Sequence, residues 1–225
     1  MSCDAKQYEA AARKCAEQFL SRGRFSHGYV LGKLMRDPMY RQIVDRAPLA
    51  EPVVDLGCGR GQTGLMLALL YPGLQVVGHD WDADKLEWAR DAAKGITGTE
   101  RLSFESGDLR SMDYHEAKTL LMLDVLHYNP IEVQDEMLRR ACACLLPRGR
   151  LFIRELDANG GWRAHTTIWV EKLGCMTGMN RGATLCFRSA DSIEAILESC
   201  GLETCRSSSF EGTPLANVLI EAKRL

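Results

Sequence analysis

Residues 53–64 read Val53-Val54-Asp55-Leu56-Gly57-Cys58-Gly59-Arg60-Gly61-Gln62-Thr63-Gly64. In this stretch a short apolar run ends in an acid and then enters a turn that holds four glycines. Glycine adopts φ > 0 at little cost and, because it has no Cβ, lets backbone N–H groups approach a ligand closely. The apolar residues 65–70 that follow are typical of a buried helix. The stretch therefore predicts a strand, a ligand-binding loop and a helix whose N-terminus faces the ligand.

The totals for the whole chain favour a single domain over residues 1–225. With 225 residues, 46% of them hydrophobic, the chain is long enough to bury one substantial core. Its formal net charge of −2 comes from 28 basic and 30 acidic residues, which lacks the strong basic excess typical of a nucleic-acid binder. We therefore expect no nucleic-acid partner.

The apolar residues and the cysteines indicate where the protein works. No window approaches the roughly 18 consecutive apolar residues of a membrane span, and the first residues contain no apolar leader. The nine cysteines are an odd number without a Cys-x-x-Cys pair, a pattern typical of thiols in a reducing compartment. We expect a soluble cytoplasmic protein without a membrane span.

The centre of the chain alternates between strand and helix patterns, which favours βαβ units and a mostly parallel sheet. The continuous apolar run 119–123 is typical of a central strand buried on both faces. Two further strands, 202–210 and 215–222, share a short connection and are therefore expected to be antiparallel neighbours. The other expected elements are strands 53–56, 75–80, 102–106 and 150–154, and helices 82–94, 131–146 and 190–200, the last capped by Ser189.

Two segments outside this pattern are expected to cover the ligand site. Residues 1–48 contain helical spacing over 4–21 and a second helical stretch that Asp37-Pro38 breaks, which we interpret as an N-terminal helical lid. Residues 158–188 follow a break in the pattern and are interpreted as a substrate-cap insertion. For residues 1–48, the alternative is that the helices only cover an edge of the core. For residues 158–188, the alternative is that the apolar residues form the buried face of an ordinary core helix. The aromatic and methionine side chains that the cap supplies are Trp162, Trp169, Met176, Met179 and Phe187.

The glycine loop formally fits two classes of nucleotide site. Gly59, Gly61 and Gly64 satisfy Gly-x-Gly-x-x-Gly, and Asp80 lies near the position of the ribose-binding acid of a dinucleotide fold. Asp55 separates the two classes, because a carboxylate at the end of the strand opposes a pyrophosphate but favours an ammonium or sulfonium group. A cationic ligand that carries a ribose is the better interpretation.

Asp55-Leu56-Gly57-Cys58-Gly59-Arg60-Gly61 resembles the first motif of the class I S-adenosylmethionine-dependent methyltransferases. The resemblance covers about residues 50–157, and the last two strands by topology. It implies S-adenosylmethionine as the cofactor, with the glycine loop around its amino-acid part and the acid beside its ammonium. It also implies an α/β, three-layer Rossmann-like methyltransferase fold, with a seven-stranded mostly parallel sheet, an antiparallel last strand and N-terminal helices.

Later residues match further motifs of this family in its order. By resemblance, Asp80 takes the ribose hydroxyls, Trp81 packs against adenine, and Asp108 with Leu109 lies near the adenine amino group. Leu123 ends the fourth strand, in the segment that the family places beside the methionine moiety and the transferring methyl. Packing at a helix start remains open for Trp81, and a surface turn remains open for Asp108.

Methyl transfer from a sulfonium requires alignment of the acceptor, and a general base where the acceptor must lose a proton. Candidate bases are His127 after the fourth strand, His165 in the cap, and Glu155 after the fifth strand. A structural role is an alternative for His127, and a solvated loop acid for Glu155. No metal site is expected, because neither a metal-ligand spacing nor the metal-dependent catechol methyltransferase pattern is evident.

The apolar cap suits an apolar or aromatic acceptor, and no Asn-Pro-Pro-Tyr or Asp-Pro-Pro-Tyr tetrapeptide follows the fourth strand. A small molecule methylated on oxygen or carbon is therefore the first hypothesis. Residues 29–38 are similar to segments of bacterial methyltransferases of polyketide- or fatty-acid-like pathways, such as aryl polyene synthesis, and Lys33 or Arg36 would then reach the cofactor carboxylate or an acidic acceptor. An RNA or protein methyltransferase and a non-catalytic cofactor-binding module are the alternatives. We expect the protein to be a monomer or a homodimer.

Overall fold

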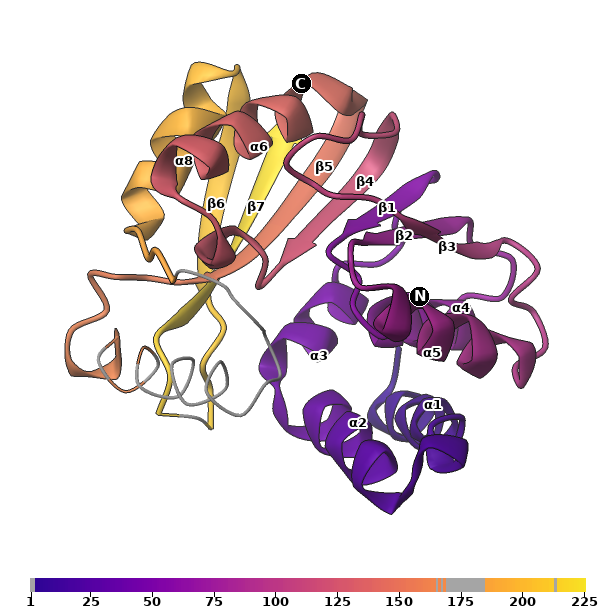
Figure 1. The fold of residues 1–225 in the computed structure, drawn as a ribbon. Helices are drawn as coiled ribbons and strands as arrows, with labels where there is room; N and C mark the ends of the chain where they lie inside the picture. The colour runs from indigo at the N-terminus through magenta and orange to yellow at the C-terminus, as the bar shows by residue number, and fades with distance from the viewer. Residues whose placement is uncertain (1–2, 165, 167, 169–184, 213) are drawn as a thin grey trace.

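A computed structural model describes residues 3–164, 166, 168, 185–212 and 214–225. Its centre is a seven-stranded sheet with the strand order β3-β2-β1-β4-β5-β7-β6 (Figure 1). The strands are β1 (Val53–Leu56), β2 (Val76–Asp80), β3 (Leu102–Ser106), β4 (Ala117–Leu123), β5 (Leu145–Leu156), β6 (Leu202–Ser208) and β7 (Asn217–Arg224).

The direction of the strands confirms the expected fold. β1 pairs in parallel with β2 and β4, and β4 pairs in parallel with β5. β7 runs antiparallel to both β5 and β6, as the short connection between the last two strands predicts. The chain therefore has the Rossmann-like methyltransferase fold, in which the carboxyl ends of β1, β2 and β4 meet at one edge of the sheet.

Helices cover the two faces of the sheet in separate layers (Figure 1). On one face, α4 (Gln62–Leu70) and α5 (Ala83–Lys94) pack on β2 and β3. On the other face, α6 (Ile131–Cys144) and α8 (Ala190–Ser199) pack on β5 to β7. α4 is apolar all round because it lies between the sheet and the N-terminal helices.

The N-terminal segment folds into α1 (Ala5–Glu17), η1 (Leu20–Arg22), α2 (Arg24–Arg36) and α3 (Pro38–Asp45). Asp4 accepts a hydrogen bond from the Gln7 N–H at 2.8 Å and caps α1. Asp37 caps α3, whose first residue is proline, so the expected break between the two helices is confirmed. The helix expected over 4–21 ends at Glu17 instead, because the chain tightens into η1 before turning at a glycine with φ of 98°.

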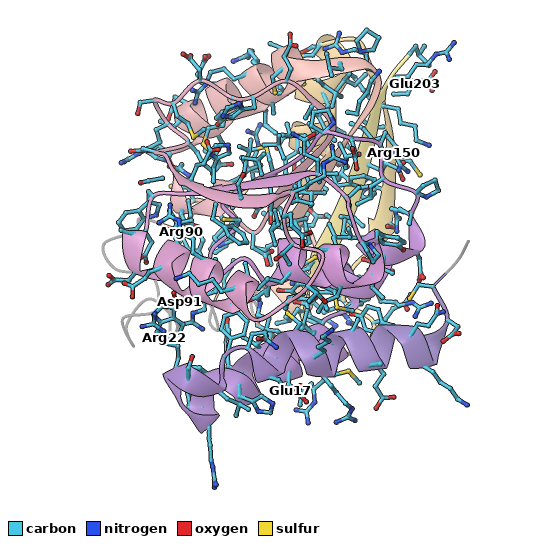
Figure 2. All side chains as sticks on the ribbon, turned by 90° about the vertical axis from the view of Figure 1, so that its right-hand side faces the viewer. Glu17, Arg22, Arg90, Asp91, Arg150 and Glu203 are labelled. Carbon is cyan, nitrogen blue, oxygen red and sulfur yellow. The ribbon has the colours of Figure 1, made fainter. Side chains whose placement is uncertain are left out.

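One contact joins the N-terminal helices to one another, and another joins them to α5. The Tyr8 hydroxyl donates a 2.6 Å hydrogen bond to the Leu34 carbonyl and joins α1 to α2. Arg22, on η1, forms ion pairs of 3.0 Å with Glu87 and 2.6 Å with Asp91, both on α5 (Figure 2). The N-terminal segment is therefore anchored through η1 on α5, in the helix layer formed by α4 and α5.

The boundary between α6 and β5 differs from the expectation. The sequence pattern extends the helix to 146 and starts the strand at 150, whereas α6 ends at Cys144 and β5 begins at Leu145. Leu145 already pairs with Ala117 of β4, and the register shifts before pairing resumes at Arg150. Residues 147–149 therefore form an irregularity within β5, because Leu145 pairs with Ala117, a residue distant in sequence, and so belongs to the strand.

Within the described part of the chain, no helix has the length and apolar character needed to cross a bilayer.

Candidate cofactor and acceptor site

The loop after β1 is held against β2 by backbone hydrogen bonds. The carbonyl of His79 accepts from the N–H of Gly57 at 2.7 Å and from the N–H of Cys58 at 2.9 Å. Gly57 has φ of 81°, and a Cβ at this position would lie 2.1 Å from Cγ1 of Val125, beyond the end of β4. Only glycine fits between β1 and the exit of β4.

Gly59, two residues further on, borders open space. Its φ is 55°, and a Cβ added there would meet no atom of the described residues within 4 Å. Gly61 (φ 72°) follows directly before α4, and its Cβ would lie 2.5 Å from the Phe104 ring. The loop is therefore closed against the core at both ends and open at its middle, where a ligand can approach the backbone.

Asp80, the last residue of β2, fixes this loop with both carboxylate oxygens. Oδ2 accepts a 2.8 Å hydrogen bond from the Gly59 N–H, and Oδ1 accepts a 2.9 Å bond from the Asp82 N–H. The carboxylate is buried and lies beside the open part of the loop. Each oxygen keeps a second lone pair, so the same group can also accept from hydroxyls of a ligand.

Asp55 lies under the loop and is only 2% exposed. Burial, followed by the nearby carboxylate of Asp80, raises the pKa of its carboxyl from 3.8 to about 7. Its Oδ2 has no hydrogen-bond partner among the residues that the structure describes. A buried carboxylate with an unsatisfied oxygen is a site that a cationic group would complete.

The remaining residues expected at the cofactor are spread around the same edge. Trp81 follows Asp80 and is 65% exposed. Asp108 is bound to Arg110, whose hydrogen bonds lower the pKa of the Asp108 carboxyl. Leu109 is buried beside Gly57, with its Cδ1 3.7 Å from the position of a Gly57 Cβ. Leu123, half-buried, ends β4. Their contacts with adenine and the methionine moiety remain predictions.

His127 and Glu155 form a buried pair at the exits of β4 and β5. His127 lies on η2 (Leu126–Tyr128), and its Nδ1 is 2.6 Å from Oε2 of Glu155. The other oxygen of Glu155 accepts a 2.7 Å hydrogen bond from the Leu126 N–H. The carboxylate therefore orients the imidazole, with Nδ1 as the donor and Nε2 as the nitrogen that can take up a proton.

The cap is described only at its two ends. Phe187 stacks on His127 with ring centroids 5.4 Å apart, and the Cys186 N–H donates to the His127 carbonyl at 2.8 Å. Trp162, at the other end, is largely exposed. The described C-terminal end of the cap therefore packs against His127. Four candidate residues lie outside the described part of the chain, namely His165, Trp169, Met176 and Met179.

An ion cluster beside this pair was not expected from the sequence. Arg154 is buried in β5 and binds both Asp124, at the exit of β4, and Asp37, the cap of α3 at 3.3 Å. Lys33 lies 3.7 Å from Asp37. The cluster fastens the N-terminal helices to the exits of the two central strands. A charged residue directly after the apolar run 151–153 was the available signal, but its partners are far away in sequence.

The N-terminal helices also contact the glycine loop directly. The guanidinium of Arg60 lies 5.1 Å from the ring centroid of Tyr29 on α2 and 4.7 Å from that of Trp88 on α5. The side chain of Gln62 donates to the hydroxyl of Tyr40 on α3. The segment expected as a lid therefore borders the loop, although its role as a lid remains a prediction.

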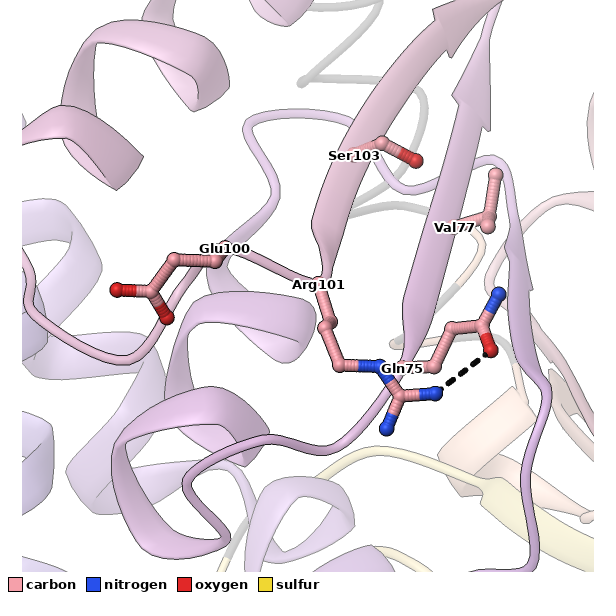
Figure 3. A pocket seen from close by; sticks show the side chains of 5 residues that line it. All are labelled: Gln75, Val77, Glu100, Arg101 and Ser103. Carbon is pink, nitrogen blue, oxygen red and sulfur yellow. Dashed lines mark hydrogen bonds between the residues drawn. The ribbon is translucent and has the colours of Figure 1, made fainter.

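One surface hollow lies away from this edge. It is lined by residues near the amino ends of β2 and β3, including Gln75 and Arg101, whose side chains are joined by a 3.0 Å hydrogen bond (Figure 3). Its volume of about 250 Å³ is below the range of roughly 300–1,000 Å³ typical of small-molecule sites. The glycine loop lies at the opposite end of these strands, so the hollow is not the cofactor site.

Comparison with known proteins gives one family. A model of the methyltransferase domain family matches residues 50–192. The methyltransferase GfsG of Streptomyces halstedii is 26% identical over 172 residues, which are 76% of this chain and 59% of that protein. The trans-aconitate 2-methyltransferase of Methylobacterium nodulans is 32% identical over 118 residues, 51% of this chain and 43% of that protein. The chain thus spans about half the length of these curated relatives.

The fold is shared with solved structures. The magnesium protoporphyrin IX methyltransferase of Synechocystis PCC 6803, solved with bound SAH, superimposes with a TM-score of 0.59 and 20% identity. That likeness covers 98% of this chain and 86% of the other. It extends over the N-terminal helices and the last strands as well as the glycine loop.

Proposed function

Because this chain belongs to the methyltransferase domain family and uses S-adenosylmethionine, we propose that it methylates a small molecule at an acidic oxygen or carbon. The cofactor supplies an electrophilic methyl group on a sulfonium. The protein must therefore bind the cofactor, exclude water and align an acceptor that becomes nucleophilic when it loses a proton.

In this proposal, the acids around the glycine loop bind the cofactor. Asp55 pairs with the ammonium, which supplies the missing partner of its buried Oδ2. Asp80 accepts from the ribose hydroxyls while its bond to Gly59 keeps the loop in place. Asp108, Leu109, Trp81 and Leu123 line the adenine and methionine ends.

The observation that carries the acceptor proposal is the 2.6 Å contact between His127 and Glu155. A carboxylate that fixes one imidazole nitrogen as a donor prepares the other to act as a general base. Such a base is needed for phenols, protonated acids or activated carbon acids, whose nucleophilic form carries one proton fewer. His165 lies outside the described residues and remains a second candidate.

The surroundings support a small acceptor. The named acceptor of one relative, trans-aconitate, is a small carboxylic acid. We propose that the N-terminal helices and the 158–188 cap enclose the acceptor, which is supported by the contacts of Arg60 with α2 and of Phe187 with His127. A polyketide- or fatty-acid-like acceptor fits the apolar cap.

The eight cysteines of the described residues are all free thiols, which supports a cytoplasmic location.

The test is an acceptor panel read out as S-adenosylhomocysteine release and as product mass. The panel contains phenols, small carboxylic acids, β-dicarbonyl compounds, transfer RNA and a protein mixture. We expect turnover with one of the first three classes and none with RNA or protein. Turnover with RNA or protein alone would overturn the proposal, and so would tight cofactor binding with no acceptor in the panel methylated.

A further inference from the structure

Three potential metal ligands converge on the face of β2 and β3 that is turned away from α4 and α5. They are His79 of β2, Glu105 of β3 and His115 in the connection to β4. One ligand atom from each lies within 4.8 Å of the others. Nε2 of His115 is 3.6 Å from Oε2 of Glu105, and the two imidazole rings stack with centroids 4.9 Å apart.

His79 carries the argument because it is a buried polar side chain without a hydrogen-bond partner among the residues that the structure describes. It is 1% exposed, and neither ring nitrogen has a hydrogen-bond partner among the described residues. A buried imidazole without a hydrogen bond is costly unless its lone pair is used, and a metal ion uses it.

The cluster is separate from the cofactor site. Successive side chains of a strand point to opposite faces, and a Cβ at Gly78 would face Cys58 and Phe104 beneath the glycine loop. The His79 side chain is therefore on the other face of β2. The hollow of Figure 3 lies on the same face as the cluster, because Val77 and Ser103, which line it, stand two residues before His79 and Glu105 on the same strands.

We propose that His79, Glu105 and His115 bind a divalent transition-metal ion of the zinc class. Two imidazoles and a carboxylate suit Zn²⁺, which accepts three protein ligands and a water in tetrahedral geometry. Ligand atoms around such an ion are about 3.3 Å apart, given metal–ligand bonds of about 2.0–2.1 Å. The side chains of His115 and Glu105 are 56% and 49% exposed and can close this gap, while His79 is fixed by the sheet.

The bound ion would join β2 to the segment that leads from β3 to β4. That segment begins where the Gly107 N–H donates to the Asp80 carbonyl, and His115 stands near its end. Because the ion would bind only the folded arrangement of these two parts of the chain, metal binding is expected to raise the thermal stability of the protein. No local sequence motif reveals the site, because His79 and His115 belong to different elements.

The experiment titrates the purified full chain with Zn²⁺ by calorimetry at pH 7, in wild type and in the variants His115→Ala and Glu105→Gln. Both changes are at exposed positions, so folding should be retained. We expect one strong site in wild type. Loss of a ligand should weaken it by more than the roughly tenfold to hundredfold typical of changes beyond the ligands themselves. The matched control, His27→Ala on α2, should bind like wild type.

Co²⁺ then identifies the donor atoms. Coordination by nitrogen and oxygen gives visible d–d bands without the intense near-ultraviolet charge-transfer band of thiolate ligands, which separates this site from the cysteines. We expect that spectrum in wild type and its loss in His115→Ala. Equal Zn²⁺ affinity in wild type and His115→Ala would overturn the proposal, as would a thiolate spectrum. The stacked pair of histidines would then be packing alone.

Discussion

The Asp80 carboxylate accepts a 2.8 Å hydrogen bond from the backbone N–H of Gly59, so the acid at the end of β2 holds the middle of the glycine loop. The loop therefore does not depend on its own glycines alone for its shape. The same carboxylate also accepts from the Asp82 N–H, before α5. Loop, strand and helix are joined at one side chain, and the proposed ribose contact of Asp80 would link the conformation of the loop to cofactor binding.

Replacing Asp80 should weaken cofactor binding. In Asp80→Ala, both the ribose acceptor and the support of Gly59 are lost, and we expect binding of S-adenosylmethionine to weaken by about 1.5–3 kcal/mol. Asp80→Asn keeps one acceptor oxygen and should lose less. Calorimetry measures both. Unchanged affinity in Asp80→Ala would remove the ribose role.

Cofactor affinity should depend on the ionisation of Asp55. The pKa of this carboxyl in the free protein is about 7, above its ordinary value of 3.8, because the group is buried. The ammonium of the cofactor requires the charged form, so affinity should fall by up to about tenfold for each pH unit below 7. Asp55→Asn should bind more weakly at pH 8 and with little dependence on pH. A wild-type affinity that is flat from pH 5.5 to 7.5 would contradict this assignment.

The same shift has the opposite consequence for the stability of the cofactor-free protein. A raised pKa in the folded state stabilises it fully below the unfolded value near 3.8, and this contribution is lost as the pH rises through about 7. Asp55→Asn removes the buried carboxylate. We therefore expect the variant to gain stability over wild type as the pH rises from about 4 to 7, with little further gain above 7, measured by urea unfolding. A constant difference between the two proteins would contradict the raised pKa.

Two glycines of the loop should respond differently to alanine. In Gly57→Ala, the new Cβ would meet Val125 at 2.1 Å with φ at 81°, so we expect a loss of about 2–4 kcal/mol of unfolding free energy from strain and overpacking. Gly59→Ala meets no protein atom within 4 Å and should lose about 1 kcal/mol or less. Its effect should instead fall on cofactor binding, because its Cβ enters the open side of the loop. Equal unfolding curves for the two variants would show that the loop relaxes around either residue.

The buried ion cluster predicts a large effect at Arg154. Arg154→Ala leaves Asp37 and Asp124 without their shared cation, and removing one partner of a buried pair typically costs about 3–5 kcal/mol. Arg13→Ala is the control, since the Arg13–Glu9 pair is exposed and should be worth less than about 1 kcal/mol. Urea unfolding of the two variants gives the comparison. Similar losses in both would mean that the cluster contributes no more than a surface pair.

Most of the fold follows from local patterns in the sequence. The bounds of β1 and β3 agree with the apolar runs 53–56 and 102–106, and Ser189 caps α8 as its side chain predicts. The glycine loop and the acids Asp55 and Asp80 are also local signals, because chemistry and turn geometry coincide there. The disagreements occur where a distant partner decides, as when Ala117 pairs with Leu145 and extends β5.

Relations between side chains could not be predicted in the same way. His127 and Glu155 were separate candidates, and only the adjacency of β4 and β5 brings them to 2.6 Å. The bonds of Arg154 to Asp37 join residues 117 positions apart, and their pairing depends on where the N-terminal helices pack. Periodicity specifies which face of an element is buried, but it does not specify which buried polar groups meet.

The pairing of His127 with Glu155 gives the last prediction. If His127 is the base, His127→Ala should lower kcat at saturating S-adenosylmethionine by about 10²–10⁴-fold, and the pH profile of kcat should change because the base is gone. His127→Asn is the matched variant, since its amide can still donate to Glu155 but accepts no proton. If it folds like wild type and binds S-adenosylmethionine normally yet turns over as slowly as His127→Ala, the loss is chemical. Wild-type turnover and pH profile in His127→Asn would assign the pair a purely structural role, holding η2 to β5.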